Sequence, residues 1–284
     1  MTTQRDRFFN TIGNAYKNGR EDLIILTCDM GAAALNQFKK DKNFLLNLGP
    51  VEQLGACMSA GLALQGKKPY LYGIVPFITG RCLEQIMVSI CSQNLPVTIV
   101  GSGAALSYDL AGATHHGLCD LGLMRCIPNM TIANISTLEM AEYYANYSLE
   151  CETPLYIRLD KYKDNGVLPN EEGFFYYRIP SNNYPIVITT GAITNYLKSM
   201  LPLDFGLMEI YNFPCKENNL LACIAQSPWY NKLISVEESY KIGGLGDYLF
   251  SLGLNVTKIG FDNFCEAKPR EEYWKYLLRE VLNA

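Results

Sequence analysis

Residues 48–64 read Leu-Gly-Pro-Val-Glu-Gln-Leu-Gly-Ala-Cys-Met-Ser-Ala-Gly-Leu-Ala-Leu. Gly49 and Pro50 predict a loop, and the small and apolar residues after them predict a helix that is buried on nearly every side. This helix begins with the carboxylate Glu52, and no cationic residue lies within one turn of it in the sequence. Because burial of an unpaired carboxylate is unfavourable, Glu52 either stabilises the positive end of the helix dipole or has a specific chemical role.

Short apolar segments alternate with helical ones along the whole chain. The patterns predict strands at 23–27, 44–48, 69–74, 97–100, 131–134 and 155–159, and helices at 5–18, 52–65, 77–91 and 138–149. After a loop-like segment at 162–184 they predict strands at 185–190, 207–211, 233–237 and 255–259, and helices at 193–201, 217–226, 244–252 and 270–282. Such alternation is typical of mostly parallel sheets covered on both faces. We therefore expect two consecutive α/β domains, at residues 1–165 and 180–284.

The composition narrows the class of protein. The 284 residues are 49% hydrophobic and 18% charged, and a net charge of −4 without a Lys/Arg cluster argues against a nucleic-acid partner. No apolar run reaches the ~18 residues of a membrane span, and the start at residues 1–7 lacks the apolar region of a signal peptide. The ten cysteines contain no Cys-x-x-Cys pair, so we expect neither a disulfide framework nor a zinc site. These features predict a cytoplasmic globular protein.

Three segments follow predicted strands and carry unusual residues. They are Glu52, residues 72–81 and the glycine-rich residues 109–130. Open α/β sheets bind ligands at the carboxyl ends of their strands, so these segments are the candidate site. The two histidines of the chain, His115 and His116, both lie in the third segment. Any imidazole chemistry must therefore come from that loop.

The third segment resembles a known family. Its Gly-Ala-Thr-His at 112–115, followed by Asp-Leu at 120–121 and Arg-Cys-Ile-Pro-Asn-Met at 125–130, resembles the pyrimidine-binding domain of the transketolase family. The nearest branch is 1-deoxyxylulose-5-phosphate synthase. Gly-Pro-Val-Glu-Gln at 49–53 resembles the family's Gly-x-x-Glu-Gln/His motif, and residues 236–246 resemble the start of its carboxy-terminal domain. The three motifs occur in the family's order, so the resemblance extends over nearly the whole chain.

The resemblance implies roles for residues around the cofactor thiamine diphosphate. Glu52 would hydrogen-bond N1′ of the aminopyrimidine and stabilise the imino tautomer, whose N4′ takes the proton from the thiazolium C2. Ile74 and Phe77 would contact the pyrimidine, Phe77 by stacking on it. The cofactor supplies the carbanion chemistry, and the protein supplies placement and electrostatics. An ordinary core position remains the alternative for Phe77.

The resemblance also implies substrate contacts. His115 would hydrogen-bond oxygens of the donor sugar or relay protons. Arg158 and Lys161 match positions that carry basic phosphate ligands in relatives, although solvated charges at a strand end remain an alternative. His116 stands where the family usually has Gln and is expected to be structural. The family's acidic residue before the histidine motif is Ala111 here, with Asp109 two residues away.

Two parts of the family's site are missing from the sequence. The Gly-Asp-Gly motif with a downstream Asn, which holds the diphosphate and Mg²⁺ on another domain, is absent. We therefore expect no metal ligand on this chain but a second subunit that carries the diphosphate and Mg²⁺, in an α2β2 assembly. Residues 101–105 offer no cation for a phosphate dianion, which leaves open a differently charged acceptor such as a nucleotide-linked keto-sugar.

The leading interpretation is the pyrimidine-binding subunit of a split transketolase-like enzyme that transfers a two-carbon ketol unit between sugars. A split 1-deoxyxylulose-5-phosphate synthase would require a basic phosphate clamp in residues 101–105. The β-subunit of a 2-oxoacid dehydrogenase is disfavoured by residues 125–130. A non-catalytic assembly or regulatory subunit is the alternative of another class. The glycines at 243–246 lack dinucleotide-binding spacing. Donor, acceptor and pathway stay open.

Overall fold

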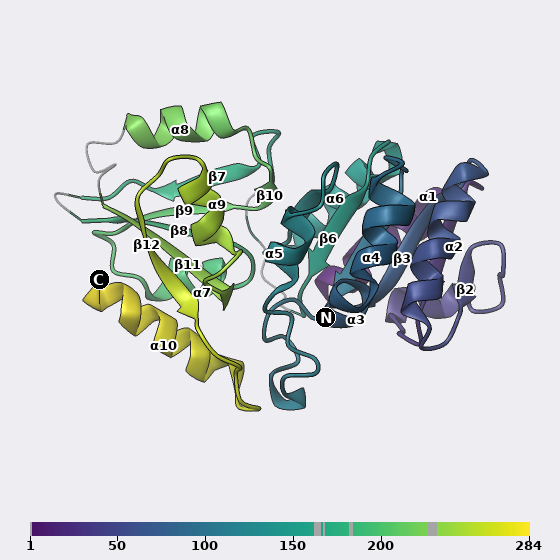
Figure 1. The fold of residues 1–284 in the computed structure, drawn as a ribbon, viewed down its shortest axis with the longest axis horizontal. Coiled ribbons are helices and arrows are strands. Elements are labelled where there is room, and N and C mark those ends of the chain that lie inside the picture. Colours follow the sequence, from purple (N-terminus) through teal and green to yellow (C-terminus); the bar gives the residue numbers. More distant parts are fainter. Residues whose placement is uncertain (1, 162–165, 167, 182–183, 227–231) are drawn as a thin grey trace.

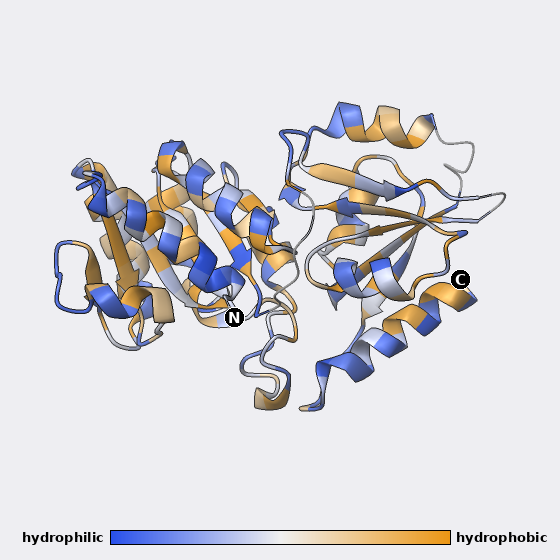
Figure 2. Ribbon diagram, turned by 180° about the vertical axis from the view of Figure 1, so that it is seen from behind, coloured by the Kyte–Doolittle hydropathy of each residue, from blue (hydrophilic) through white to orange (hydrophobic). Residues whose placement is uncertain are grey.

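The computed structural model describes residues 2–161, 166, 168–181, 184–226 and 232–284. In this part of the chain, helices cover two mostly parallel sheets, which confirms the predicted fold class (Figure 1). Strands of both sheets are hydrophobic, whereas the outer helix α10 (Arg270–Asn283) alternates between hydrophobic and hydrophilic residues (Figure 2). Within the described residues, no helix has the length and apolar character needed to span a bilayer.

The first sheet has seven strands in the order β10-β5-β6-β4-β3-β1-β2. They are β1 (Leu23–Thr27), β2 (Leu45–Asn47), β3 (Lys68–Ile74), β4 (Thr98–Ser102), β5 (Thr131–Asn134), β6 (Leu155–Leu159) and β10 (Asn212–Phe213). All pairings are parallel except that of β10 with β5. Every residue of β1, β4 and β6 is buried, as expected for strands with helices on both faces.

Two hydrophobic cores lie on opposite faces of this sheet. The first core includes residues of α1 (Gln4–Lys17), the 3₁₀-helix η1 (Ala33–Phe38) and α6 (Leu138–Glu150). The second includes residues of α2 (Glu52–Leu64) and α5 (Asp120–Arg125). A Cβ at Gly55 would lie 2.9 Å from Leu71 Cδ1, so the small residues of α2 allow this helix to approach the sheet closely.

The outer face of α2 differs from the expectation. Leu54 and Leu64 are 53% and 59% exposed, so the prediction of a helix buried on nearly every side is wrong for the isolated chain. Composition predicts how apolar a helix is, but it does not show whether a neighbouring chain or the same chain covers each face.

The second sheet has five strands in the order β12-β11-β8-β9-β7. They are β7 (Phe174–Arg178), β8 (Ile186–Thr189), β9 (Gly206–Ile210), β11 (Leu233–Tyr240) and β12 (Val256–Phe261). Its helices are α7 (Ile193–Met200), α8 (Glu217–Ala225), α9 (Leu245–Ser251) and α10. The four parallel strands and the four helices lie close to their predicted positions, since each is a regular apolar segment.

Two strands were not predicted. β7 lies in residues 162–184, which were expected to be a loop, and pairs antiparallel with β9. Its run Phe-Phe-Tyr-Tyr-Arg favours a strand but lacks apolar–polar alternation. β10 has only two residues and joins the first sheet, although the sequence around it belongs to the second round of elements. Of the expected linker, residues 162–165, 167, 182 and 183 lie outside the described residues, so the domain limits stay a prediction.

The helix predicted at 77–91 is interrupted. It consists of α3 (Val75–Ile78), the 3₁₀-helix η2 (Gly80–Cys82), α4 (Leu83–Gln85) and the π-helix η3 (Ile86–Cys91). Thr79 leaves the helical region with φ −114° and ψ −82°, and its hydroxyl donates to the carbonyl of Val75 at 2.6 Å. Interruptions of this kind re-aim side chains and occur often at functional sites.

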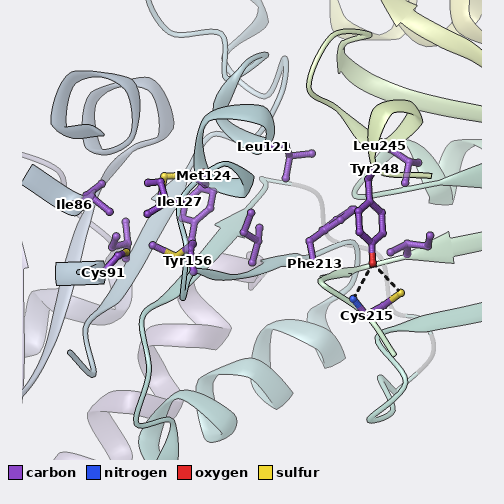
Figure 3. Close-up of a cluster of buried hydrophobic side chains, with 14 of the residues drawn as sticks. Ile86, Cys91, Leu121, Met124, Ile127, Tyr156, Phe213, Cys215, Leu245 and Tyr248 are labelled. Carbon is purple, nitrogen blue, oxygen red and sulfur yellow. Dashed lines mark hydrogen bonds between the residues drawn. The ribbon is translucent and has the colours of Figure 1, made fainter. Parts of the chain in front are cut away.

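The two halves of the chain share one core. The cluster that contains Tyr156 and Met124 of the first half continues to Phe213 and Tyr248 of the second (Figure 3). The rings of Phe213 and Tyr248 are 5.2 Å apart and edge-to-face, and the backbone N–H of Cys215 donates to the Tyr248 hydroxyl at 3.2 Å. The two halves therefore pack directly against each other.

Candidate active site

Glu52 is the first residue of α2, and its side chain is 4% exposed. Val51, the residue that precedes the helix, provides no side-chain cap. The cationic partner of Glu52 comes from the 3₁₀-helix η2, because Arg81 Nη1 donates to Glu52 Oε2 at 2.8 Å. The absence of a nearby cation in the sequence was therefore misleading: the fold supplies one, and the buried carboxylate is paired.

Phe77 lies in α3, after the carboxyl end of β3. The guanidinium carbon of Arg81 is 4.2 Å from the centroid of the Phe77 ring, a cation–π arrangement. The ring of His115 lies 5.2 Å from that of Phe77 at an interplanar angle of 68°. Phe77 is thus half-buried beside two residues that can bind a ligand. Ile74, the last residue of β3, is also half-buried.

The loop that carries His115 is closed at its base by two paired residues, called here the stem. Ala105 and Gly117 form an antiparallel bridge, with the N–H of Gly117 donating to the carbonyl of Ala105 at 2.8 Å. A Cβ at Gly117 would lie 2.7 Å from Val75 Cγ1, so only glycine allows this approach to α3. The stem therefore holds the loop directly beside the segment that carries Phe77.

The two adjacent histidines have different environments. His115 is partly exposed, and its Nδ1 lies 2.9 Å from the Thr114 hydroxyl. His116 is 6% exposed, and its Nε2 lies 3.0 Å from the backbone carbonyl of Asp109. His115 can therefore meet a ligand, while His116 joins two parts of the loop.

Lys161 is linked to His115 through the ring of Tyr108. Its Nζ is 3.8 Å from the centroid of the Tyr108 ring, and Tyr108 is 6.1 Å from the ring of His115. Burial lowers the pKa of Lys161, and the charges of Asp109 and Asp160 oppose this effect. Glu52, Arg81, Phe77, His115, Tyr108 and Lys161 thus form one continuous strip, called here the site strip.

Arg158 is not part of the site strip. Its side chain is 4% exposed and forms an ion pair with Asp120, with Nε 2.7 Å from Oδ2 and Nη2 3.0 Å from Oδ1. Nη2 also donates to the carbonyl of Gly117 at 2.6 Å, and Nη1 to Asn134 Oδ1 at 3.4 Å. The expected substrate contact does not fit this arrangement, because the guanidinium is buried and used to hold the stem of the His115 loop.

The site strip can hold an aromatic, nitrogen-containing ring. Glu52 offers a buried acceptor, Phe77 an aromatic face and His115 a group that can move a proton. This set fits the aminopyrimidine that the resemblance implies. The described residues contain no group of three or more His, Cys, Asp or Glu that could hold a metal ion.

Sequence reasoning overlooked three residues of this region. Arg81 ends the candidate segment 72–81 but was given no role, although it lies only four residues after Phe77. Asp120 belongs to the His115 motif, and only its pairing with Arg158 in space shows its use. Arg270 pairs with Asp160 across 110 positions, and no local pattern indicates such a contact.

Comparison with known proteins found relatives that cover most of the chain. Residues 7–163 match the family described as "Transketolase, pyrimidine binding domain". A subunit of apulose-4-phosphate transketolase from Actinobacillus succinogenes is 32% identical over 148 residues, which are 52% of this chain and 48% of that protein. The subunit of the same name from Phocaeicola vulgatus is 27% identical over 255 residues, covering 87% and 82%. The 1-deoxy-D-xylulose-5-phosphate synthase of Clostridium tetani is 34% identical over 285 residues, covering 92% and 46%.

The chain spans about half the length of the first and the last of these relatives. Among solved structures, "Split gene transketolase, inactive beta4 tetramer" has a TM-score of 0.81 at 20% identity and covers 100% of this chain and 98% of its own. The transketolase from Leishmania mexicana has a TM-score of 0.77 at 15% identity and covers 100% of this chain and 45% of its own. At such identities, the likeness concerns the fold.

Proposed function

The chain belongs to the transketolase family through its pyrimidine-binding domain, and we propose that it is the pyrimidine-binding subunit of a split thiamine diphosphate-dependent enzyme. The enzyme would transfer a two-carbon ketol unit between sugars. The observation that carries this proposal is the juxtaposition of Glu52, Phe77 and His115 in the site strip, with the His115 ring 5.2 Å from that of Phe77.

Four residues of the site strip would have roles in such a reaction. Thiamine diphosphate, when bound, supplies a carbanion-stabilising thiazolium. Glu52 would hold a hydrogen bond at N1′ of its pyrimidine, and Phe77 would support the ring. His115 is partly exposed and would hydrogen-bond oxygens of the sugar or move a proton to them. Lys161 would add positive charge at the far end of the strip.

An exposed apolar surface supports the need for a partner. Five apolar residues of α2, its preceding residue and η3 are between 40% and 59% exposed; they are Val51, Leu54, Leu64, Met87 and Val88. Clusters of exposed apolar residues are typical of surfaces that bind another protein. We propose a second subunit that carries the diphosphate and Mg²⁺ site, in an α2β2 assembly. That the relatives from A. succinogenes and P. vulgatus are named as subunits agrees with this.

Two substrate classes are favoured by different observations. Likeness to proteins named apulose-4-phosphate transketolase subunits favours a ketol transfer between sugars. The 34% identity to a 1-deoxy-D-xylulose-5-phosphate synthase favours the alternative, in which a 2-oxoacid is decarboxylated. Residues 101–105, which are the end of β4 and the start of the loop after it, contain no cation for either substrate. We propose the ketol transfer as the function and leave the acceptor sugar to experiment.

Calorimetry tests this proposal. Thiamine diphosphate and Mg²⁺ are titrated into the chain alone and into a mixture with a candidate partner that carries a Gly-Asp-Gly motif. Tight binding in the mixture, lost in Glu52→Gln but kept in the exposed control Glu272→Gln, would support the split enzyme. Absence of binding in both preparations would contradict it and indicate a non-catalytic assembly subunit.

A further inference from the structure

Arg270 is a buried cation at which three distant segments meet. Its Nη1 and Nη2 donate to the two carboxylate oxygens of Asp160 at 2.9 and 2.7 Å. Its Nε and Nη2 donate to the two oxygens of Glu238 at 2.5 and 2.6 Å. The three side chains are only 12%, 1% and 4% exposed. Two bidentate contacts fix the guanidinium far more firmly than one exposed ion pair could.

The backbone of Arg270 joins the same cation to the His115 loop. α10 begins at Arg270, and the preceding Pro269 gives it no side-chain cap. The cap comes instead from Asp109, whose Oδ2 accepts from the N–H of Arg270 at 2.9 Å across 161 positions of sequence. A carboxylate at the first turn of a helix is stabilised both by this hydrogen bond and by the helix dipole.

Asp109 also contacts His116 through its backbone. Its backbone carbonyl lies 3.0 Å from Nε2 of the buried His116, the neighbour of His115 in the chain. Arg270 is connected to the His115 loop a second time through Asp160, because the Ser107 hydroxyl donates to Asp160 Oδ1 at 3.3 Å. Arg270 thus contacts Asp160 and Asp109, and each of these holds a different point of the loop.

Loss of Arg270 would release the loop for an electrostatic reason. Asp160 and Glu238 are both buried and both bind the same guanidinium, so without it two carboxylates would face each other. Burial already raises the pKa of Glu238, and Arg270 is the charge that opposes this. Separation of the two carboxylates would pull the end of β6 away from β11 and carry Ser107 with it.

We propose that Arg270 is a positioning residue for His115, through which the carboxy-terminal half of the chain controls turnover without touching substrate or cofactor. The proposal rests on the proposed function for its kinetic part. The hydrogen bonds of Arg270 run to Asp160, Glu238 and Asp109 and not to Glu52 or Phe77, so the two residues expected to hold the cofactor pyrimidine keep their own contacts when Arg270 is replaced. Loss of these contacts therefore lowers the rate and leaves cofactor affinity unchanged.

The test uses two routes to the same loop. Arg270→Lys keeps one positive charge, but an ammonium cannot bind both carboxylates bidentately, so Asp160 and Glu238 would partly repel each other. Asp109→Ala removes the cap of α10 without leaving a buried carboxylate unpaired. Asp109→Asn keeps an acceptor oxygen and serves as the rescue. Arg279→Met, an exposed arginine on the same helix, is the matched control. Hydrogen exchange of the full chain is followed at residues 105–117 and, for comparison, in β1.

The expected result is faster exchange in residues 105–117 for Arg270→Lys and Asp109→Ala, with β1 unchanged and Asp109→Asn close to wild type. In the assembled enzyme, kcat would fall by at least about tenfold while the Kd for thiamine diphosphate stays the same, as expected when a reacting group is misplaced. Unchanged exchange in the loop would overturn the proposal, as would unchanged kcat with a loosened loop. A wild-type assembly without turnover would contradict the proposed function instead, and hydrogen exchange would still decide whether Arg270 holds the loop.

Discussion

Glu52 and Arg81 are 29 positions apart in the sequence and meet at 2.8 Å beside the ring of Phe77. The carboxylate is buried, while the Arg81 side chain is 46% exposed, so the pair lies at the boundary between core and solvent. An interaction of this kind allows a carboxylate to remain inside an apolar helix start and still be reached by a ligand.

Replacement of Arg81 by Met leaves the Glu52 carboxylate buried without its cation. Because Arg81 is itself half-exposed, we expect the free energy of unfolding to fall by only about 1 kcal/mol. The double variant Glu52→Gln/Arg81→Met should recover most of that loss, since no unpaired charge remains. Urea unfolding of the single and double variants measures this. Equal effects of Arg81→Met with and without the carboxylate would show that the pair has no coupling.

Replacement of Phe77 by Leu removes the aromatic face of the site strip and keeps an apolar side chain. Stacking of a heteroaromatic ring on an aromatic side chain contributes about 1–3 kcal/mol, so the Kd for thiamine diphosphate should rise by about tenfold or more. Calorimetry on the assembled enzyme measures it. Phe264→Leu makes the same change at a ring that is 81% exposed and should leave the Kd as in the wild type. An unchanged Kd in Phe77→Leu would indicate that Phe77 is an ordinary packing residue.

Replacement of Arg158 by Met breaks a fully buried ion pair. Loss of one partner leaves Asp120 as an unpaired buried charge, so the free energy of unfolding should fall by about 3–5 kcal/mol. The companion Asp120→Asn should also destabilise the protein, because Tyr156 and Arg158 both donate to this carboxylate. Denaturant unfolding is the measurement. If Arg158→Met instead kept its stability and only raised the KM for a sugar phosphate, Arg158 would be the substrate ligand that the resemblance implies.

Glu209 gives a prediction about pH. Burial raises the pKa of this β9 carboxyl from 4.5 to about 7, although Tyr177 donates to it at 2.6 Å and Lys198 acts in the opposite direction to burial. The raised pKa means that the folded protein prefers the protonated acid. Stability is therefore lost as the pH rises from the unfolded pKa through the folded one, by on the order of 3 kcal/mol in total.

Glu209→Gln removes this titration. Relative to the wild type, the variant should be markedly more stable at pH 8 and show little difference near pH 4, where the carboxyl is largely protonated in both states. Urea unfolding across this range measures the difference, with Glu272→Gln as a control at an exposed carboxylate. A difference that does not grow between pH 4 and pH 8 would show that folding does not raise the pKa of Glu209.

Local patterns predicted most of the fold and failed at identifiable places. β1, β5 and β6 have their predicted bounds because each is a short buried apolar run between polar residues. The predicted helix at 77–91 is interrupted because Thr79 and Gly80 lie inside an otherwise regular apolar spacing. β7 was missed because this edge strand lacks the apolar–polar alternation that marks a half-exposed strand.

The candidate site was likewise predicted only in part. Glu52, Phe77 and His115 could be proposed from motifs at strand ends, since parallel strands bring their carboxyl ends to one edge. Their partners could not be proposed, because Arg81 and Arg270 act through pairings that depend on the whole fold. For Arg158 the motif position was misleading, because its partner Asp120 lies in the neighbouring helix α5 and takes up the charge.

The pairing of β10 with β5 affects how the chain can fold during its synthesis. The strand pairs with β5 through Asn212 and Phe213, so the first sheet lacks its last strand until these residues have left the ribosome. Until then, a nascent chain presents the open edge of β5, and open edges pair readily with other chains. Synthesis and folding of the first half are therefore coupled to the arrival of the second, and a chain released before residue 213 would be exposed to misassembly.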